Sequence, residues 1–596
     1  MFDCLFENKN ANENKEKYVF KLPIDYLDES VVFDLSPTVA ADLEMRGGGG
    51  GGDDSSDGSS AGTIYDIMLN VVPNTFGSIT APLWCRKYTT DTVFLKDTQK
   101  ILPLVDSVTT DDGELDAELE VHRRLTENKN FLGQYNYIEW DCFKDLNRNP
   151  KFLHSLAMLH VFSPAVSLLL PVLFLFLPFV ILQVSGIPLT PENYINTLKT
   201  VSRNHFIGKL LTVFDNQSFS NLAYVAAMGA FFTLQIYQNT VSFQHYYSNI
   251  KQLNDDLCTI YARIIRTIAH IKHFLRAAAG LASYTAFCAV AQHKLHTLQK
   301  IEDMLRGLRP FAANVDKLNE LGDLLHKYYE LYDNTEYRSV LEYAYSFCGF
   351  VSNLAGVASL FHRRAIRAAS FVGGSDDGGC AATQITKQYY PPHIRSSRRI
   401  RNNCRLNKNI IITGVNASGK TTQLKTTMIN VILSQQFGCG FYKKCRLVPY
   451  THIHSYLNIP DTSGRDSLFQ AESRRCKEII DIIGETDVAT TRHLCIFDEL
   501  YSGTNADEAK KAAFAFLKYI SSFSNVNFIL TTHYTELCHE FISDTRIQNY
   551  KMLVTRNDEH GELNYLYKMR RGICKMKGGI DILKQMNYPA EILSML

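Results

Sequence analysis

A short glycine-rich segment in the last third of the chain has the residue types and spacing of a phosphate-binding loop. The segment Gly414–Thr421 reads GVNASGKT, which fits the pattern G-x-x-x-x-G-K-T. Its glycines allow backbone N–H groups to wrap a phosphate, Lys420 can reach the terminal phosphates, and the hydroxyl of Thr421 can ligate Mg²⁺. The residues that this pattern predicts to contact the phosphates are Gly414, Asn416, Ala417, Ser418, Gly419, Lys420, Thr421 and Thr422.

Two further segments end in side chains suited to hydrolytic chemistry. HLCIFDE ends in Asp498 and Glu499, and VNFILTT is followed by His533. An acidic residue at the carboxyl end of a buried strand is placed to hold Mg²⁺, so we predict Thr421 and Asp498 as metal-binding residues. Glu499 is predicted to be the base that activates water. His533 alone would more often be a structural turn residue, but the two neighbouring strand ends favour a catalytic role near the terminal phosphate.

The elements that must position these residues alternate as they do in a parallel α/β sheet. From about Asn409 onward, short apolar segments alternate with helical patterns. Asn409–Thr413 is predicted to be a buried strand that leads into the glycine-rich loop. Thr422–Ser434 is predicted to be the helix whose positive N-terminus faces the same phosphates. A strand before the loop and a helix after it are the context that a phosphate-binding loop requires.

The order of these motifs resembles the ATPase domain of the MutS family, the DNA mismatch-repair ATPases. The resemblance covers about Gln388 to the C-terminus and rests on GVNASGKTT, TSGRDSLFQAE, IFDELYSGTN and TTHYTEL. It implies ATP hydrolysis with ATP and Mg²⁺ as the nucleotide and the metal. Ser463–Glu472 is similar to the family's signature loop with one residue added. This implies that Ser467 reaches the phosphate bound by another subunit, and therefore a homodimer with composite ATP sites.

The sequence departs from the family pattern at positions near the nucleotide. Val415 stands where the family usually has proline, and Ser502 stands where it has arginine. The aromatic residue that would stack on adenine is expected near Ile400, which is not aromatic, so Tyr389 and Tyr390 are candidates. We recognise no mismatch-reading domain upstream. The resemblance is therefore to a MutS-like form that lacks this domain, as in large DNA viruses.

Upstream of this domain, two stretches without charged side chains predict a transmembrane hairpin. The first is Val161–Pro191 and the second, weaker one is Asn216–Gln244. About 18 uncharged apolar residues suffice to cross a bilayer as a helix. The first stretch contains Pro164, Pro171 and Pro178, which a membrane-spanning helix tolerates better than a water-soluble helix does. The alternative for both stretches is a core segment buried by protein.

The remaining regions are expected to be helical, with flexible linkers between them. Apolar residues from Leu253 to Leu275 recur at helical spacing and predict long helices that resemble the lever helices of the MutS family. The predicted organisation is multidomain, with a C-terminal α/β P-loop ATPase domain preceded by an α-helical core and lever region. The predicted divisions are an N-terminal segment (1–62) with a Gly/Ser/Asp-rich linker (46–62), the start of the core and lever (63–155), the transmembrane hairpin (156–240), the returning lever helices (241–372), a linker (373–387) and the MutS-like ATPase domain (388–596).

Composition limits the class of protein but leaves its target open. The 596 residues include 62 Lys+Arg and 61 Asp+Glu, so no strongly basic domain marks a nucleic-acid-binding protein. The basic run His393–Lys408, which has six Lys/Arg and no acidic residue, is either a solvated loop or a contact to phosphate or DNA. The 14 cysteines are scattered without metal-ligand spacing, which fits a reducing compartment.

Two functions remain as alternatives at this point. The first is a Mg²⁺-dependent ATPase of the MutS family, linked to DNA mismatch repair or recombination and anchored in a membrane with its ATPase domain on the cytosolic side. The second is a membrane-anchored, ATP-driven switch or tether that does not act on DNA. An ABC transporter is disfavoured, because the sequence has no LSGGQ-type loop and at most two spans. Whether DNA is bound stays open.

Overall fold

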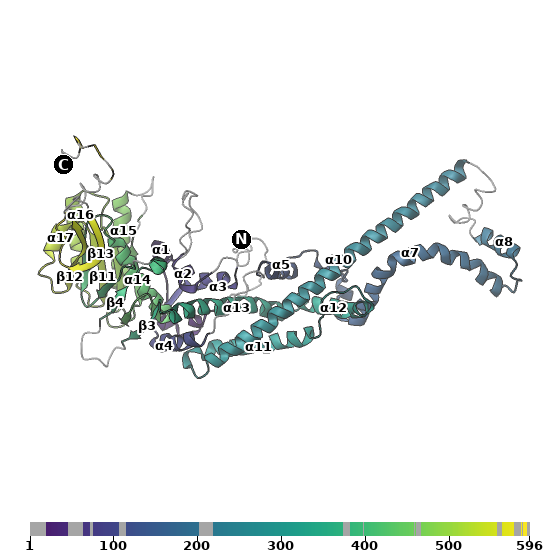
Figure 1. Ribbon diagram of the computed structural model, residues 1–596, viewed down its shortest axis with the longest axis horizontal. Helices are drawn as coiled ribbons and strands as arrows, with labels where there is room; N and C mark the ends of the chain where they lie inside the picture. The colour runs from purple at the N-terminus through teal and green to yellow at the C-terminus, as the bar shows by residue number, and fades with distance from the viewer. Residues whose placement is uncertain are drawn as a thin grey trace. The chain divides into compact units, whose positions relative to one another are not determined.

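The computed structural model describes most of the chain (Figure 1). The described residues are 20–45, 63–71, 75–105, 115–201, 219–372, 382–396, 399–457, 459, 467–556, 563–576, 586, 588–589 and 591–592, without the side chains of 167–174 and 219–222. The predicted linker 46–62, residues 373–381 of the predicted linker 373–387 and the signature-loop residues Ser463–Asp466 lie outside the described residues. Residues 384–387 of the second linker belong instead to strand β4 (Gln384–Gln388).

The chain folds into two compact units that are each built from several segments. Unit 1 comprises Met1–Leu115, Ala269–Leu295 and Glu342–Leu596, and unit 2 comprises Asp116–Ile268 and His296–Leu341. Three long helices contribute residues to both units: α10 (Phe219–Ala277), α11 (Thr285–Leu305) and α13 (Thr335–His362).

The α/β domain expected at the C-terminus is present and lies in unit 1. Its six-stranded sheet has the order β13–β12–β6–β11–β10–β9, in which neighbouring strands from β12 to β9 pair in parallel and β13 is antiparallel to β12. All five residues of β6 are buried, as expected for a central strand covered on both faces. The strands are β6 (Asn409–Thr413), β9 (His452–Tyr456), β10 (His493–Asp498), β11 (Val526–Thr532), β12 (Ile547–Arg556) and β13 (Leu563–Arg571).

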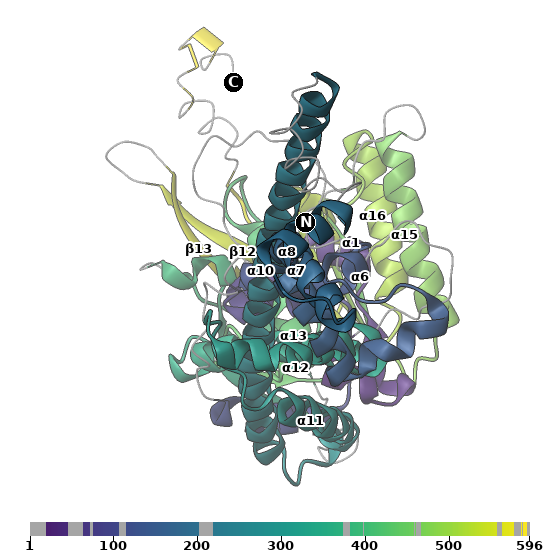
Figure 2. The same ribbon diagram turned by 90° about the vertical axis from the view of Figure 1, so that its right-hand side faces the viewer.

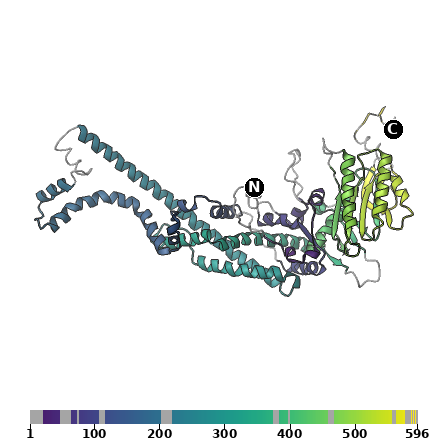
Figure 3. The same ribbon diagram turned by 180° about the vertical axis from the view of Figure 1, so that it is seen from behind.

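Helices cover both faces of this sheet. On one face, α15 (Leu468–Glu485) and α16 (Ala506–Ile520) lie side by side, as Figures 2 and 3 show, and bury one apolar core with alternate residues of β6, β10 and β11. The other face packs against α14 (Lys420–Phe437), which follows the phosphate-binding loop. This helix begins two residues before and ends three residues after the predicted helix, because Gly438 adopts φ 70° and caps its C-terminus. A short helix, α17 (Thr535–Glu540), follows β11.

A second sheet and the N-terminal segment pack around α14 in the same unit. The second sheet has the order β5–β4–β8–β3–β7, and a separate pair joins β1 to β2. The strands are β1 (Val32–Asp34), β2 (Lys87–Thr89), β3 (Arg367–Phe371), β4 (Gln384–Gln388), β5 (Asn402–Arg405), β7 (Cys439–Gly440) and β8 (Lys444–Leu447). The helices are α1 (Pro37–Asp42), α2 (Ile64–Leu69), α3 (Phe76–Trp84) and α4 (Thr92–Ile101), with 3₁₀ turns at Pro23–Tyr26, Glu29–Val31, Leu102–Leu104, Ala282–Tyr284 and Pro391–Arg395.

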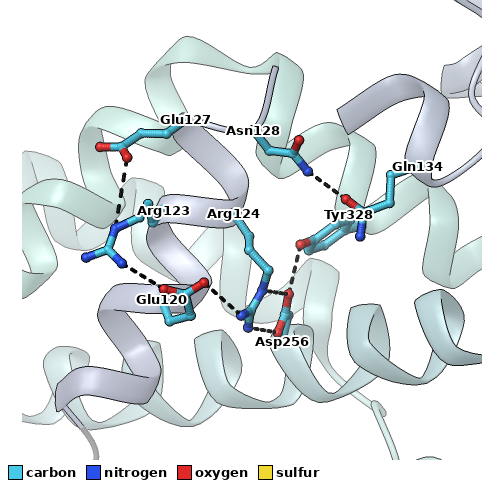
Figure 4. Close-up of polar contacts among 8 residues, drawn as sticks. All are labelled: Glu120, Arg123, Arg124, Glu127, Asn128, Gln134, Asp256 and Tyr328. Atoms are coloured by element: carbon cyan, nitrogen blue, oxygen red, sulfur yellow. Dashed lines mark hydrogen bonds and ion pairs between the residues drawn. The ribbon is translucent and has the colours of Figure 1, made fainter. Parts of the chain in front are cut away.

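Unit 2 is helical and is tied together by buried polar contacts. Its own helices are α5 (Leu115–Thr126), α6 (Phe131–Gln134), α7 (Pro150–Val184), α8 (Pro191–Val201) and α12 (Val315–Asp333), with a 3₁₀ turn at Asp141–Arg148. Arg124 of α5 donates to both carboxylate oxygens of Asp256 in α10, at 2.6 and 3.1 Å, and the Tyr328 hydroxyl of α12 donates to the same carboxylate at 2.9 Å (Figure 4). Burial raises the pKa of Asp256, and the bonds from Arg124 and Tyr328 oppose this shift. Three helices therefore share one buried carboxylate.

The two predicted membrane segments fall in long helices, but a transmembrane hairpin is not confirmed. Residues 161–184 of the first segment lie in the 35-residue helix α7, which Figure 3 shows as bent, and residues 219–244 of the second lie in the 59-residue helix α10. Among the described residues, α13 is the one helix with the length and hydropathy of a membrane span, and 83% of its apolar window is buried in the protein. A buried core helix passes the same test, so α13 is weak evidence for a membrane. The apolar stripe predicted from Leu253 onward is largely buried along α10.

Candidate nucleotide-binding site

The glycine-rich loop connects the central strand β6 directly to helix α14. Within the loop Ala417 and Gly419 adopt positive φ angles of 59° and 88°, and Gly419 is the N-cap residue of α14. These angles turn the chain sharply, so that the first N–H groups of the helix have no partner within the helix and can bind an anion. The predicted residues Asn416 to Thr422 all line a cavity of about 760 Å³. Gly414 lies at the end of β6, just before this lining.

The loop has features that fit a phosphate group. The hydroxyl of Ser418 is buried and has no hydrogen-bond partner among the described residues. A Cβ atom at Gly414 would lie only 2.7 Å from this hydroxyl, and one at Gly419 would lie 3.2 Å from the ring of Tyr567. Larger side chains at either glycine would therefore occupy the space around the loop. A buried hydroxyl without a partner at the N-terminus of a helix matches the acceptor oxygens of a phosphate.

Lys420, Glu499 and His533 meet at one point, although they come from three separate segments. The His533 Nε2 atom lies 2.9 Å from Lys420 Nζ and 2.9 Å from Glu499 Oε1. A ring nitrogen either carries a proton or offers a lone pair, so Nε2 can donate to Glu499 or accept from Lys420, but not both at once. The bond to His533 is the largest influence on Glu499 and lowers the pKa of its carboxyl group. Glu499 is therefore ionised at neutral pH.

Thr421 and Asp498, the predicted metal-binding residues, are in direct contact. The hydroxyl of Thr421 donates to Asp498 Oδ2 at 2.7 Å, and the hydroxyl of Thr531 donates to the other carboxylate oxygen. Both of these hydrogen bonds come from neutral hydroxyls, so neither of them places a cationic side chain on the carboxylate. A hydroxyl and a carboxylate oxygen are ligands that Mg²⁺ prefers, so the pair fits this ion.

The turn after β10 is held in an uncommon backbone conformation. Glu499 and Tyr501 have φ angles of 52° and 58°. The buried carboxylate of Glu472, at the end of the signature-loop segment, accepts hydrogen bonds from the N–H and hydroxyl of Ser502 and from the N–H of Gly503, at 2.8 to 3.1 Å. This carboxylate thereby fixes the turn that carries Glu499. Strain of this kind persists where the surrounding structure over-determines it.

Aromatic side chains also line the same cavity. Tyr389 lines it, but its ring is buried and its hydroxyl donates to the carbonyl of Ala365 at 2.6 Å. Tyr390, the other candidate from the sequence, also lines the cavity and is half-buried. The rings of His393, Tyr565 and Tyr567 also line the cavity. The two tyrosines of β13 lie with ring centroids 6.1 Å apart.

Ser467 does not line this cavity. It is exposed and caps helix α15, where its hydroxyl accepts from the N–H of Gln470 at 3.3 Å and Gln470 bonds back to the N–H of Ser467 at 2.9 Å. The structure thus brings together Lys420, Thr421, Asp498, Glu499 and His533 and leaves Ser467 outside the group.

Sequence reasoning missed several residues that shape the site. Glu472 is the last residue of the signature-loop segment, and the motif alone indicates no contact for its carboxylate. Thr531 lies within the apolar segment VNFILTT, where the sequence indicates only a strand. Tyr565 and Tyr567 lie about 145 residues after the loop, and no local pattern marks them. Asn402 lines the cavity and donates to Gln423 of α14 at 3.1 Å. A polar residue in a basic run gave no signal of this contact.

Comparison with known proteins shows that this domain is similar to a domain of MutS proteins. Residues 410–595 match the family model of MutS domain V. A DNA mismatch repair protein MutS of Staphylococcus haemolyticus (strain JCSC1435) is 28% identical over 197 residues, which cover 32% of this chain and 21% of that protein. A protein of the same name from Staphylococcus aureus (strain JH9) is 29% identical over 200 residues, which cover 32% of this chain and 22% of that protein. The chain therefore matches about a fifth of the length of these curated relatives.

Proposed function

We propose that this chain, which belongs to the MutS family through its C-terminal domain, binds ATP with Mg²⁺ and hydrolyses ATP to ADP and phosphate. The observation that carries this proposal is the meeting of Lys420, Glu499 and His533 beside the glycine-rich loop, with His533 Nε2 at 2.9 Å from both other side chains. The match to MutS domain V, the ATPase domain of MutS proteins, supports it.

In this proposal Thr421 and Asp498 hold the metal ion. A bound Mg²⁺ neutralises charge on the phosphates and orients them for in-line attack. The carboxylate of Asp498 is kept in place by the hydroxyls of Thr421 and Thr531, which fixes where its oxygens point. The loop N–H groups and the hydroxyl of Ser418 would donate hydrogen bonds to the phosphate oxygens.

Glu499 is proposed to accept the proton from the attacking water. The hydrogen bond from His533 keeps the carboxyl of Glu499 ionised and directs it toward the cavity. Lys420 supplies positive charge to the terminal phosphates. Burial is the largest influence on Lys420 and lowers the pKa of its ammonium group, which Glu499 and Asp498 oppose. Phosphate charge would favour the ammonium form further, so phosphate binding and protonation of Lys420 reinforce each other.

The roles of Glu499 and Lys420 can be separated by substitution. In Glu499→Gln we expect ATP to bind normally and turnover to fall by roughly 10²–10⁴, because general-base catalysis contributes about this much. In Lys420→Ala we expect ATP binding itself to weaken. Nucleotide binding by fluorescence and phosphate release by the purified full chain measure the two effects. Undiminished turnover in Glu499→Gln would exclude Glu499 as the base.

We further propose that the chain acts as a homodimer in DNA mismatch repair or recombination. The exposed position of Ser467, outside its own cavity, supports a site completed by a second copy. The relatives named DNA mismatch repair protein MutS support the link to repair, which rests on the domain that they share with this chain. This similarity favours a DNA-linked role over a switch that does not act on DNA.

We propose attachment to a membrane as a second property, because large apolar side chains of α7 and α10 are exposed. In α7, Phe176 is 61% exposed and Val184 is 84% exposed, and in α10 Phe231 is 61% exposed. Isolated apolar residues on a surface need no explanation, but consecutive exposed ones along a helix do. The exposed large apolar residues described in α7 are Leu159, Phe162, Val166, Leu175, Phe176, Leu177, Phe179, Val180, Ile181 and Val184. A bilayer with the ATPase domain on its cytosolic side would cover them.

A further inference from the structure

A hollow lined by four cationic side chains lies next to the nucleotide cavity and has no role in the proposed hydrolysis. Its volume is about 490 Å³, and its lining consists of Lys387, Ser396, Arg399, Arg401 and Lys568. We call it the basic hollow. Of these residues only Ser396 also lines the nucleotide cavity, so the two sites adjoin without overlapping. The arginines belong to the basic run His393–Lys408, for which the sequence allows either a solvated loop or a contact to phosphate or DNA.

Two irregular strand positions direct the lysines into the basic hollow. Lys387 in β4 has a φ angle of 54°, and the pairing of β4 with β5 shifts register between Ile385 and Gln388. In β13 the residue before Lys568, Tyr567, also has a φ angle of 54°. Bulges of this kind re-aim side chains and are common beside functional sites. A non-glycine residue in this conformation is strained, so both positions need bracing from outside.

The side chains of Asn402 and Asn403 provide that bracing. Asn403 accepts from the N–H of Lys387 at 2.8 Å, while Asn402 donates to the carbonyl of Tyr567 at 3.0 Å and accepts from the N–H of Met569 at 3.0 Å. The ammonium of Lys568 donates to the carbonyl of Arg401 at 2.7 Å. Strands from both sheets are therefore joined at the basic hollow.

The charges in the basic hollow are not balanced by ion pairs within the part of the chain that the structure describes. None of its four cations forms an ion pair with another described residue, although the described part of the chain contains many such pairs. The guanidinium groups of Arg399 and Arg401 lie 5.7 and 5.9 Å from the centre of the same Tyr389 ring, and the hollow has no acidic lining residue. Four cations held together by strained backbone repel one another, and an anion would relieve this repulsion.

We propose that the basic hollow binds consecutive phosphate groups of a second ligand, distinct from the ATP held by the glycine-rich loop. Guanidinium and ammonium groups recognise phosphate by charge and hydrogen bonds, and four of them match a ligand with several phosphates. Such phosphates occur in a free oligophosphate and in a nucleic-acid backbone. Asn402 also donates to Gln423 of the loop helix, so occupation of the hollow is expected to change the affinity for ATP.

The test uses the full chain with its loop site saturated by a non-hydrolysable ATP analogue, so that no result depends on hydrolysis. Binding of inorganic tripolyphosphate is measured by calorimetry, and binding of a fluorescent 20-nucleotide single-stranded DNA by anisotropy at several salt concentrations. In Arg399→Gln/Lys568→Gln we expect affinity for at least one probe to fall about tenfold or more. For the DNA probe, the slope of log affinity against log salt should decrease by about two.

Two control variants make the result specific. Lys511→Gln/Lys518→Gln removes two exposed lysines of α16 and should leave binding unchanged, whereas Arg399→Lys/Lys568→Arg keeps the charge and should retain binding. Loss with tripolyphosphate alone would identify a small phosphate ligand, and loss with DNA alone would identify a nucleic-acid backbone. Three outcomes would overturn the proposal. Both Gln pairs could weaken binding equally, or the unmodified chain could bind neither probe. Binding could also be lost in Lys420→Ala but kept in Arg399→Gln/Lys568→Gln.

Discussion

At the scale of single residues, His533 is the side chain on which the proposed site depends. Its Nε2 atom is shared between Lys420 and Glu499, and the hydrogen bond to Glu499 is what chiefly lowers the pKa of that carboxyl group. A lowered pKa means that the carboxylate survives to more acidic pH than an ordinary glutamate would. The base can then work over a wider pH range.

This reasoning predicts the pH dependence of a His533 variant. In His533→Asn the pKa of Glu499 should rise, because the lowering influence is lost while the burial that raises this pKa remains. Glu499 then becomes protonated at a higher pH, so the acid limb of the kcat profile should move to higher pH. Steady-state phosphate release between about pH 4 and pH 8 measures the limb. A shift to lower pH, or no shift, would contradict this influence of His533 on Glu499.

The sequence predicted the residues that form a contiguous or strand-end pattern and missed those that depend on the fold. The loop residues, Asp498 and Glu499 could be found because phosphate and metal chemistry fix their spacing and their place after a strand. Glu472 braces the Glu499 turn from about 30 residues away; it ends the signature-loop motif, but the motif does not show which backbone groups its carboxylate binds. Tyr389 was a reasonable candidate by position, but its buried ring and its bond to Ala365 give it a packing role.

At the scale of elements, helix α14 links the nucleotide loop to residues 65–89 through the buried amides of two glutamines. Gln436 is fully buried; its amide donates to the carbonyls of Trp84 and Lys87, both at 2.8 Å, and accepts from the hydroxyl of Tyr65 at 2.7 Å. Gln435 similarly donates to the carbonyls of Thr89 and Tyr450. These bonds satisfy backbone groups at the ends of α3 and β2, so the helix cannot detach without leaving them unpaired.

We therefore expect Gln436→Ala to destabilise the protein strongly. The carbonyl of Lys87 would lose this hydrogen bond, and Tyr65 and Trp84 would keep only the 3.1 Å bond between the Tyr65 hydroxyl and the Trp84 carbonyl. Leaving a buried polar group unsatisfied costs about 1–3 kcal/mol. Urea unfolding followed by circular dichroism measures the loss. Gln384→Ala, at an exposed position of β4, is the matched control and should change the free energy of unfolding by less than about 0.5 kcal/mol. Equal effects of the two substitutions would show that the amide contacts of α14 contribute little.

Strand and helix types were predictable in the α/β domain, but the second sheet was not. The expected strand Asn409–Thr413 matches β6, because a short apolar run before a glycine-rich turn has few other structures open to it. Strands β3, β4, β5, β7 and β8 are two to five residues long and largely polar, so they give no periodic signal. Their pairing depends on contacts between distant segments. The helix after the loop was underestimated because its buried polar residues interrupt the apolar pattern.

At the scale of the whole molecule, the first question is whether two chains share one catalytic site. If Ser467 acts on the phosphates of a partner, Ser467→Ala should lower hydrolysis while ATP binding is retained. Mixing Ser467→Ala chains with Lys420→Ala chains should then recover part of the activity, since each mixed dimer has one site with both residues intact. Phosphate release on mixing and ultracentrifugation with ATP measure this. No recovery, together with a monomer at all concentrations, would contradict a composite site.

The second question at this scale is what covers the apolar side chains of α7 and α10. If α7 enters a bilayer, the substitution Phe176→Arg should release the chain from membranes, because a charge at the centre of a span costs about 2.5–3.5 kcal/mol on insertion scales. ATP hydrolysis should persist, since Phe176 is exposed and lies in unit 2, whereas the loop site is built in unit 1. Ser155→Arg, at an exposed position of the same helix before the uncharged stretch, is the matched control and should stay bound. Flotation of the full chain with liposomes and extraction with carbonate report the outcome. Complete recovery of the unmodified chain in the soluble fraction would rule out the anchor, and the exposed side chains would then need a protein or nucleic-acid partner to cover them.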